Sequence, residues 1–324
     1  MVSSNIYLIN DSKGDFGKNP EERTIPELLN CGIINIDKPK GPTSHLVVDH
    51  IKKILKINKA GHSGTLDPGV TGVQPIALNR ATRITHFLLT APKEYVCLMH
   101  LHQKISIDLI KKAFQKYVGE ITQLPPVKSA VKREKRIRRI YDLKILEIED
   151  QEVLFKVKCQ AGVYIRKLCS DLGQELKIGA HMAELRRTQA GSFNEQDNLV
   201  TLNDVQDAYA FYVKDNNPKL LRHCLQPIEK AIEHLPKCWV LDTAVLSLTH
   251  GRSLAIPGIS KLELFDKGET VAILTLKGEL IAIGEAIMAT TEIKNNTKGQ
   301  ALKLKKVFME EINPSPQSSL PNPD

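Results

Sequence analysis

The stretch Gly61-His-Ser-Gly-Thr-Leu-Asp-Pro-Gly69 surrounds a single carboxylate with turn-forming residues. Gly72 follows closely, and the residues from Val73 to Leu78 are more apolar. Glycines and Asp-Pro pairs favour tight turns, so we expect a loop that presents Asp67 shortly before a strand. The same composition is typical of an ordinary surface turn, and its meaning therefore depends on the sequence around it.

Length and composition indicate a soluble globular protein of two domains. The chain has 324 residues, of which 42% are hydrophobic and 25% are charged, and domains typically hold about 100–200 residues. No apolar run approaches the roughly 18–20 residues that span a bilayer, and the first residues lack the pattern of a secretory signal. The six cysteines form no Cys-x-x-Cys pair, which argues against a zinc ribbon and favours a reducing compartment.

Helical and strand patterns alternate irregularly around the opening stretch. Apolar residues recur at helical spacing in four segments, which begin after Thr43 or Ser44, near Ser106, near Ile165 and after Asn203. Strand-like segments include residues 32–36, 95–101 and 153–159. This mixture predicts an α+β fold rather than a regular βαβ succession.

We expect four segments along the chain. We expect residues 1–30 to form an extension that docks on the rest of the protein. We expect residues 31–233 to form the α+β domain. Residues 234–312 contain two apolar runs on either side of Lys277-Gly278, a pattern typical of a hairpin with a two-residue turn, and predict a small β-barrel-like module. Residues 313–324 include four prolines and predict a disordered tail.

Positive charge is concentrated in the α+β segment. The whole chain carries 45 Lys and Arg against 37 Asp and Glu, a formal net charge of +8, whereas residues 31–233 carry 32 against 22. In the densest run, Lys128 to Arg139, seven basic side chains face only Glu134. Such a run is commonly a solvated surface, but an exposed basic loop also suits phosphate binding. The charge permits a polyanionic partner without identifying one.

Several fragments together resemble a known family. They are Asp37-Lys-Pro-Lys-Gly-Pro-Thr-Ser-His45, Gly61-His-Ser-Gly-Thr-Leu-Asp-Pro68, Gly119-Glu-Ile with Pro125-Pro-Val-Lys-Ser-Ala-Val-Lys132, and Gly179-Ala-His-Met-Ala-Glu-Leu-Arg-Arg187. The series resembles the TruB family of RNA pseudouridine synthases, and more narrowly its dyskerin-type branch from the box H/ACA ribonucleoproteins of archaea and eukaryotes. This implies the pseudouridine synthase fold, with a mixed, largely antiparallel central sheet and flanking helices. It also identifies residues 234–312 as a PUA RNA-binding domain.

By this resemblance, three residues carry the chemistry. Asp67 matches the catalytic aspartate, and Arg166 matches the arginine that pairs with it. Tyr95 matches the tyrosine that stacks on the target base and helps to remove its C5 proton. A guanidinium orients a carboxylate bidentately and favours its charged form.

Further residues are implied in substrate binding. Leu185 matches an apolar residue beneath the base. His62 matches a residue that contacts the space left by the extruded nucleotide, although it is alternatively an ordinary loop histidine. Lys38 has either a structural or an RNA-contacting role. The basic run matches the family's mobile thumb loop over the RNA, in which the expected phosphate-binding residues are Lys132, Arg133, Lys135 and Arg136.

The implied reaction needs neither a redox change nor a metal, so we expect no cofactor. His100 and His102 share one face of a strand, but no third ligand supports a metal site. Some positions depart from the family pattern. His100 replaces a more usual arginine, Gln103-Lys104 a glycine–acid pair, Gln74 an apolar residue and Val163 a threonine. We expect His100 to alter how its strand binds RNA.

The resemblance implies an isomerase that is the RNA-guided catalytic subunit of a box H/ACA particle and acts on rRNA, with tRNA as a further substrate. Two alternatives stay open: a guide-independent enzyme for the T-arm uridine of tRNA, and a non-catalytic RNA-binding scaffold. The expected partners are guide RNA, substrate RNA, a small zinc-ribbon or hook-like protein, a glycine–arginine-type regulatory subunit and a kink-turn-binding ribosomal-type protein. No membrane is expected. The compact length, without a lysine-rich tail, favours an archaeal cytoplasmic enzyme over a eukaryotic nucleolar one.

Overall fold

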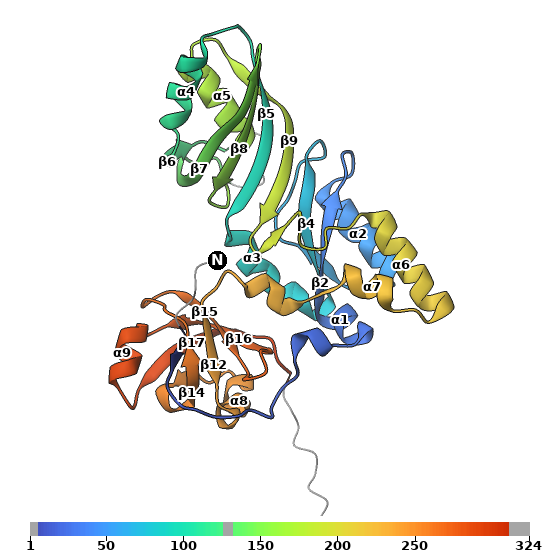
Figure 1. The fold of residues 1–324 in the computed structure, drawn as a ribbon, viewed down its shortest axis with the longest axis vertical. Helices are drawn as coiled ribbons and strands as arrows, with labels where there is room; N and C mark the ends of the chain where they lie inside the picture. Colours follow the sequence, from blue (N-terminus) through green and yellow to red (C-terminus); the bar gives the residue numbers. More distant parts are fainter. Residues whose placement is uncertain (1–5, 126–131, 311–324) are drawn as a thin grey trace, which may run out of the picture. The chain divides into compact units, whose positions relative to one another are not determined.

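A computed structural model of the chain describes residues 6–125 and 132–310. The chain divides into two compact units: the larger unit is Thr24–Ala231, and the smaller unit combines Met1–Arg23 with Ile232–Asp324. Each has its own sheet and hydrophobic core (Figure 1). The tail expected over residues 313–324 and the start of the basic run at Lys128 lie outside the described residues.

A ten-stranded sheet forms the centre of the larger unit. Its main path runs through β11 (Gln226–Pro227), β2 (Gly32–Lys38), β4 (Thr71–Leu78), β9 (Ala180–Ala190), β5 (Lys93–Leu101), β8 (Glu152–Cys159), β7 (Arg136–Glu149) and β6 (Gly119–Gln123). Two short strands, β3 (Ala60–His62) and β10 (Phe193–Asn194), pair with β4 and β9. Among these pairs only β4 with β9 is parallel, which confirms the expected mixed, largely antiparallel sheet.

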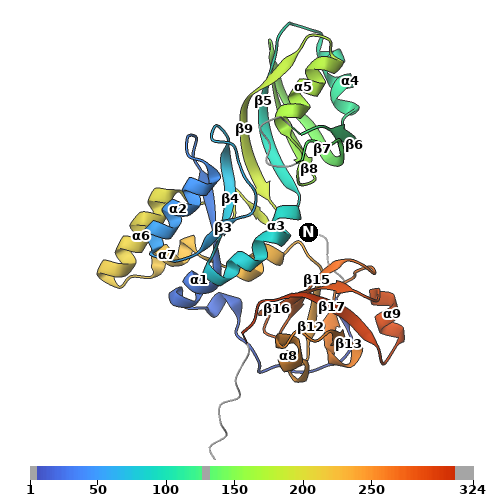
Figure 2. The ribbon, with the colours of Figure 1, turned by 180° about the vertical axis from the view of Figure 1, so that it is seen from behind.

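Two groups of helices pack on different parts of this sheet (Figures 1 and 2). One group, α4 (Ile107–Gln115) and α5 (Ile165–Glu175), shares a core with β5, β7 and β8. The other group, which shares a core with β2 and β4, consists of α1 (Ile25–Cys31), α2 (Ser44–Leu55), α6 (Leu202–Asp215) and α7 (Lys219–Cys224). A short helix, α3 (Thr85–Thr90), precedes β5.

Local sequence explains where two of these helices begin. The hydroxyl of Thr43 accepts a hydrogen bond from the amide of Leu46 at 3.2 Å, which satisfies an amide that has no partner inside α2. The apolar stripe expected on α2 is buried. α6 begins at Leu202, earlier than expected, because Thr201 and Asp204 form a capping box in front of it.

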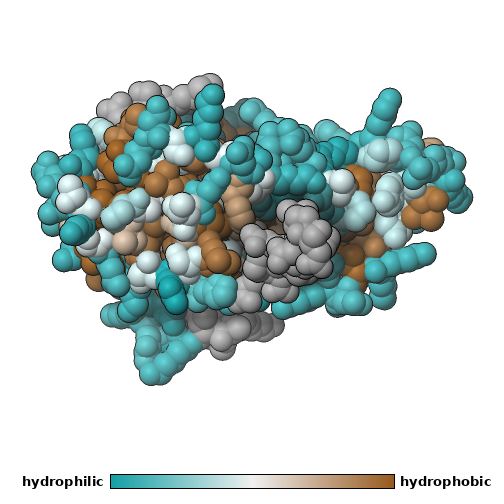
Figure 3. Space-filling model, turned by 90° about the horizontal axis from the view of Figure 1, so that it is seen from below, coloured by the Kyte–Doolittle hydropathy of each residue, from teal (hydrophilic) through white to brown (hydrophobic). Residues whose placement is uncertain are grey.

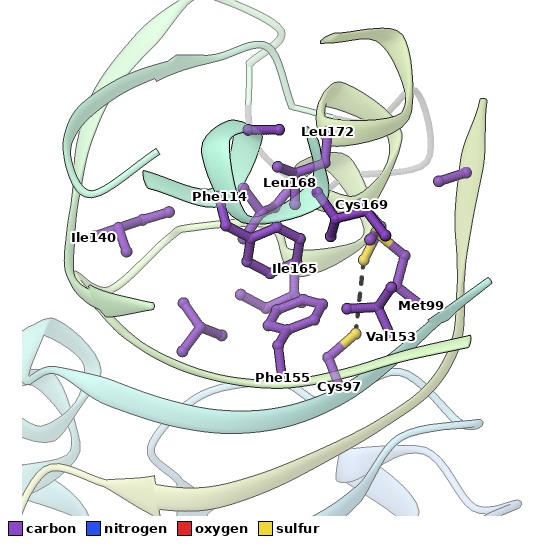
Figure 4. Close-up of a cluster of buried hydrophobic side chains, with 14 of the residues drawn as sticks. Cys97, Met99, Phe114, Ile140, Val153, Phe155, Ile165, Leu168, Cys169 and Leu172 are labelled. Atoms are coloured by element: carbon purple, nitrogen blue, oxygen red, sulfur yellow. Dashed lines mark hydrogen bonds between the residues drawn. The ribbon is translucent and has the colours of Figure 1, made fainter. Parts of the chain in front are cut away.

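Figure 4 shows the core enclosed by β5, β8, α4 and α5. The rings of Phe114 and Phe155 meet edge to face with centroids 5.2 Å apart, and the Sγ atoms of Cys97 and Cys169 lie 3.6 Å apart. All four side chains are at most 3% exposed, and complete burial of one large apolar side chain contributes about 1.5–3 kcal/mol. This core fixes the first turn of α5 against β5.

A seven-stranded sheet forms the smaller unit. Its order is β1 (Tyr7–Leu8), β14 (Ile259–Leu262), β12 (Lys237–Val240), β15 (Thr270–Leu274), β16 (Leu280–Ala286), β17 (Gln300–Val307) and β13 (Leu254–Ala255), with helices α8 (Asp242–Thr249) and α9 (Thr290–Asn295). The pairing of β15 with β16 confirms the predicted hairpin, but the predicted two-residue turn is wrong. The amide of Thr275 donates to the carbonyl of Glu279 at 2.9 Å, which leaves a three-residue loop whose last residue, Gly278, has a φ of +90°.

Residues of the expected N-terminal extension belong to both units. β1 adds an edge strand beside β14. The carboxylate of Asp242 accepts a hydrogen bond from the amide of Asp15 at 2.8 Å, and that of Glu279 accepts one from the amide of Lys18 at 2.7 Å. Two carboxylates of the smaller unit therefore hold the first segment, whereas the chain joins the larger unit from Thr24.

None of the helices in the described part of the chain is long and apolar enough to cross a membrane. Figure 3 shows one face of the molecule, where hydrophilic side chains are interspersed with hydrophobic ones. Isolated exposed apolar side chains, such as Leu8 and Leu264, are normal on a protein surface.

Candidate active site

The loop between β3 and β4 presents Asp67 to solvent. The amide of Val70 donates to the Asp67 carbonyl at 3.0 Å, which closes a tight turn. Ser44, the first residue of α2, fixes the residue before Asp67: its hydroxyl accepts from the Leu66 amide at 2.8 Å and donates to the Leu66 carbonyl at 3.1 Å. The end of one helix therefore anchors the loop.

Arg166 lies in the first turn of α5, and its guanidinium pairs with the Asp67 carboxylate. Both side chains are 57% exposed, so a substrate can reach the pair. Exposed ion pairs contribute only about 0–1 kcal/mol to stability. The pair therefore serves to orient the carboxylate more than to hold the fold together.

Tyr95 on β5 faces Arg187 on β9 because the pairing of these strands contains a β-bulge. Glu94 pairs with Gln189 and Tyr95 pairs with Arg187, so the register skips Thr188. Bulges re-aim side chains and recur beside active sites. Burial raises the pKa of Tyr95, whereas the charge of the Arg187 guanidinium acts in the opposite direction.

Leu185 shares the sheet face of Tyr95. It is half-buried on β9 and pairs with Cys97, which lies two residues after Tyr95 on β5. Alternate residues of a strand face the same side, and both Leu185 and Tyr95 pack against the core beneath α5. This position suits the implied role beneath the target base.

Lys38 is fully buried at the end of β2. Its ammonium group donates to the carbonyls of Pro39 at 2.9 Å, Pro68 at 3.3 Å and Val70 at 2.8 Å. Burial lowers the pKa of Lys38, and the charge of Asp67 opposes this effect. A side chain without exposed surface does not suit the implied RNA contact, so the geometry favours the structural role, in which Lys38 stabilises the Asp67 loop.

His62 ends β3, and it is half-buried and neutral near pH 7. Burial, with smaller effects of His45 and Arg187, lowers its pKa to about 4. Its Nδ1 accepts a hydrogen bond from the Gly64 amide at 3.3 Å, so the ring proton is on Nε2. In the part of the chain that the structure describes, the buried Nε2 has no hydrogen-bond partner. The exposed part of the ring, rather than the buried Nε2, is therefore open to contact with a substrate.

The described part of the basic run leads into β7. Lys132, Arg133 and Lys135 are exposed, and Arg136 is the first residue of the strand. Lys132 pairs with Glu134, and the Arg136 guanidinium donates to the Lys132 carbonyl at 3.4 Å. The exposure of these cations is compatible with the expected contacts to phosphates.

Sequence reasoning misses Arg187, which is 1% exposed and lies next to the Asp67 loop. Its Nε donates to the Val73 carbonyl at 2.7 Å and its Nη2 to the Gly64 carbonyl at 3.4 Å. The signal is the alternation of the strand: Arg187 shares the face of Leu185, whereas Arg186 points to the other face. An arginine on the apolar face of a strand marks a buried cation.

Lys93 is a second buried cation that the sequence does not single out. Its ammonium group donates to the carbonyls of Leu88 and Leu89 in α3 at 2.8 Å and to that of Ala91, which follows the helix, at 2.7 Å. Burial, and then the charge of Arg187, lowers the pKa of Lys93 to about 7. Lysines at the start of strands are too common to predict such a position.

Gln74, Val163 and His100, which depart from the family pattern, take part in local packing. Gln74 is buried and its Nε2 donates to the Ser44 carbonyl at 3.1 Å. Val163 is 9% exposed and belongs to the core around α5. Nδ1 of His100 lies 2.6 Å from the carboxylate of Glu152. Gln74 and His100 therefore each have one polar partner, although Oε1 of Gln74 is buried without a partner among the described residues, and Val163 packs in an apolar core.

His181 on β9 lies beside the two histidines of β5. The Nε2 of His102 and the Nδ1 of His181 are 3.0 Å apart, and the rings of His100 and His181 are 5.2 Å apart between centroids. Within residues 6–125 and 132–310, however, no group of three or more His, Cys, Asp or Glu side chains is arranged to hold a metal ion.

An exposed aspartate–arginine pair on a largely antiparallel sheet, joined in one chain to a small β unit, is the arrangement of an RNA pseudouridine synthase. Four family models match the chain: a DKCLD (NUC011) domain over residues 10–48, the TruB family pseudouridylate synthase N-terminal domain over 52–165, a tRNA pseudouridylate synthase B C-terminal domain over 166–233 and a PUA domain over 236–308. The chain belongs to the TruB family of pseudouridine synthases, which are RNA isomerases.

Curated relatives agree with this assignment. A protein of Pyrococcus furiosus named "Probable tRNA pseudouridine synthase B" is 51% identical over 300 residues, which are 92% of this chain and 88% of the relative. A protein of Methanothermobacter thermautotrophicus with the same name is 49% identical over 297 residues, 91% of each chain.

Solved structures indicate to which branch of the TruB family the chain belongs. The crystal structure of a Cbf5-Nop10-Gar1 complex matches with a TM-score of 0.91 and 49% identity, covering 96% of this chain and 95% of the other. A structure of an H/ACA RNP bound to a substrate RNA that contains 2′-deoxyuridine matches with a TM-score of 0.89 and 46% identity, covering 96% of each chain. The chain is therefore of the Cbf5 type, which confirms the resemblance to the dyskerin-type branch.

Proposed function

We propose that this chain is the RNA-guided catalytic subunit of a box H/ACA particle, which converts uridine to pseudouridine in rRNA and in tRNA as a further substrate. The observation that carries the proposal is the exposed Asp67 carboxylate held by Arg166. The similarity to Cbf5 over 96% of the chain supports the guided form of the activity.

The reaction breaks the bond between the ribose C1′ and N1 of uracil, rotates the base and joins C1′ to C5. The proton on C5 is lost and N1 gains one, so the atoms balance without an oxidant or reductant. Asp67 begins the sequence, either by attacking C1′ or by removing the proton from C2′. Arg166 directs the carboxylate oxygens towards the ribose.

Three further side chains act on the base in this proposal. Tyr95 stacks on it and helps to remove the C5 proton, and Leu185 lies beneath it. Extrusion of the uridine from its stack costs a few kcal/mol. His62, which is neutral and has a buried Nε2 without a partner in the described chain, contacts the space that the nucleotide leaves.

We also propose a set of partners. The similar structures are named as complexes with Nop10 and Gar1 and with a substrate RNA. By analogy this chain binds guide RNA, substrate RNA, a zinc-ribbon or hook-like protein, a glycine–arginine-type subunit and a kink-turn-binding protein of the ribosomal type. The archaeal source of the relatives favours a cytoplasmic enzyme.

Two other functions are distinguishable. One is a guide-independent enzyme for tRNA, and the curated relatives are named as probable tRNA pseudouridine synthases. A non-catalytic RNA scaffold is disfavoured, because Asp67, Tyr95 and Arg166 are all present and Asp67 is paired.

The test is turnover of one target RNA by the full chain alone, with a guide RNA, and with guide RNA and partner proteins. Guided activity gives pseudouridine only in the assembled particle and only at the uridine that the guide selects, and a guide that pairs with another target is the matched control. Product in a tRNA T arm from the chain alone would favour the first alternative. RNA binding without product under every condition would favour the scaffold.

A further inference from the structure

We propose that Arg187 is a positioning residue of this site, whose side chain lies between Tyr95 and the loop that carries Asp67. This inference rests on the proposed function, because it assigns Arg187 a part in the same reaction. Arg187 lies on β9 and is 1% exposed. It therefore acts on the reaction through the residues that it contacts.

The side chain and the backbone of Arg187 both contact the segment around Asp67. The guanidinium donates to the carbonyls of Gly64 and Val73, which stand on either side of Asp67 in the sequence. The backbone of Arg187 pairs in parallel with Gly72. A Cβ atom on Gly72 would lie 2.2 Å from the Arg187 carbonyl oxygen, and Gly72 has a φ of +104°. The close approach therefore requires glycine.

The other connection of Arg187 is to Tyr95. The β-bulge at Thr188 makes Arg187 the cross-strand partner of Tyr95, and opposite residues of an antiparallel pair have Cβ atoms about 4.5–5.5 Å apart on the same face. The two side chains therefore extend from the same face, and the charge of Arg187 opposes the rise in the Tyr95 pKa that burial causes. Without the bulge, Thr188 would occupy this position and Arg187 would face the other side.

The charge of Arg187 is not neutralised by a carboxylate, because the hydrogen-bond partners of its guanidinium are backbone carbonyl groups. The neighbouring Arg186 differs: it bonds both carboxylate oxygens of Asp37 at 2.9 Å and that of Glu195 at 2.6 Å. A fixed cation in a buried site stabilises negative charge that develops nearby. Arg187 therefore stabilises the phenolate form of Tyr95, which takes the proton from C5 and becomes a neutral phenol.

The experiment compares Arg187→Gln, which keeps hydrogen-bond donors but removes the charge, with Arg187→Lys, which keeps the charge. Single-turnover rates are measured across pH with the assembled particle, and Arg186→Lys is the matched control. We expect Arg187→Gln to lower the rate about 100-fold and to leave the RNA affinity nearly unchanged. A shift of reacting groups by about 1 Å has an effect of this size on the rate. In this variant the reaction rate should begin to rise at a higher pH than in the wild type. The reason is that the Arg187 charge no longer opposes the rise in the Tyr95 pKa caused by burial. Arg187→Lys should lose less rate and keep the pH profile.

Two results would overturn the inference. One is wild-type rates in both folded Arg187 variants. The other is a slower reaction whose pH profile is the same in Arg187→Gln and in the wild type, which would show a purely structural role. If Arg187→Gln does not fold, Arg187→Lys decides: a slower rate at unchanged RNA affinity supports the inference, and a wild-type rate opposes it. Failure of the wild-type chain to form pseudouridine would instead contradict the proposed function.

Discussion

The carboxylate of Asp67 and the guanidinium of Arg166 form an ion pair although 99 positions separate them in the chain. Asp67 lies on the loop between β3 and β4, and Arg166 lies in the first turn of α5. The core around Cys169 holds that helix against β5. The geometry of the pair therefore depends on how α5 packs and not on local sequence.

Replacement of Asp67 by asparagine should abolish pseudouridine formation and leave RNA affinity nearly unchanged. The amide is isosteric but cannot attack C1′ or remove a proton from C2′. Because pseudouridine has the mass of uridine, the RNA is labelled with a carbodiimide before mass spectrometry. Asp108→Asn, at an exposed acid of α4, is the control and should keep full activity. Labelled product from the Asp67 variant would refute the assignment of the catalytic carboxylate.

Arg166→Lys should slow the single-turnover reaction by about 10–100-fold, because an ammonium group lacks the planar fork that orients both carboxylate oxygens. Stability should hardly change, since both partners are more than half exposed. Rapid-quench kinetics measures the rate, and thermal unfolding measures the stability. Lys167→Arg, at the next residue of α5, is the control. A normal rate for the Arg166 variant would show that pairing with Asp67 is not needed for catalysis.

Lys38→Met should lower the free energy of unfolding by about 2–4 kcal/mol, because buried carbonyls around Asp67 lose their donor. Urea denaturation at equilibrium measures this difference. The exposed Lys40 offers the comparison, and Lys40→Met should change stability by no more than about 0.5 kcal/mol. Equal stability of the two variants would mean that Lys38 does not support the loop.

His62 should make stability depend on pH between about 6.5 and 4. Its pKa is lowered to about 4, mainly by burial, so the unfolded chain binds more protons than the folded chain in this window. The stability that His62 contributes is therefore complete above about pH 6.5 and is lost as the pH falls towards 4. With allowance for partial solvent exposure, the loss is about 2 kcal/mol.

The measurement is the unfolding free energy at several pH values for the wild type and for His62→Gln. The variant should show a weaker pH dependence in this window, because glutamine does not titrate. Parallel curves for the two proteins would mean that the imidazole is accessible to protons in the folded state.

Neutralising Lys132, Arg133, Lys135 and Arg136 should weaken substrate binding and reduce its dependence on salt. Each phosphate contact with single-stranded nucleic acid contributes about 0.7 to the slope of log K against log salt concentration, so the slope should fall by up to about 3. Titrations at several salt concentrations give this value. If the slope stays the same, these cations are a solvated surface and not part of the RNA contact.

The positions of single helices and of the Asp67 loop were predictable from the amino-acid sequence. Hydrophobic periodicity placed α2, α4 and α5, and Thr43 marked the start of α2. The turn-forming residues around Asp67 predicted the loop that presents it. These features depend on neighbours a few positions apart, where periodicity and capping act directly. The three-residue loop before Glu279 shows the limit of such reasoning, because strand register rather than composition sets the length of a turn.

Long-range packing determines which distant groups meet at the site. The β-bulge that turns Arg187 towards Tyr95, and the three carbonyls that surround Lys38, depend on strand register and on burial. A buried cation is costly unless hydrogen bonds compensate it, and here the compensating carbonyls come from segments far apart in the chain. The residues next to each cation in the sequence therefore do not predict which carbonyls will bind it. Sequence therefore supplied the residues that do the chemistry, and long-range packing supplied the groups that hold them in place.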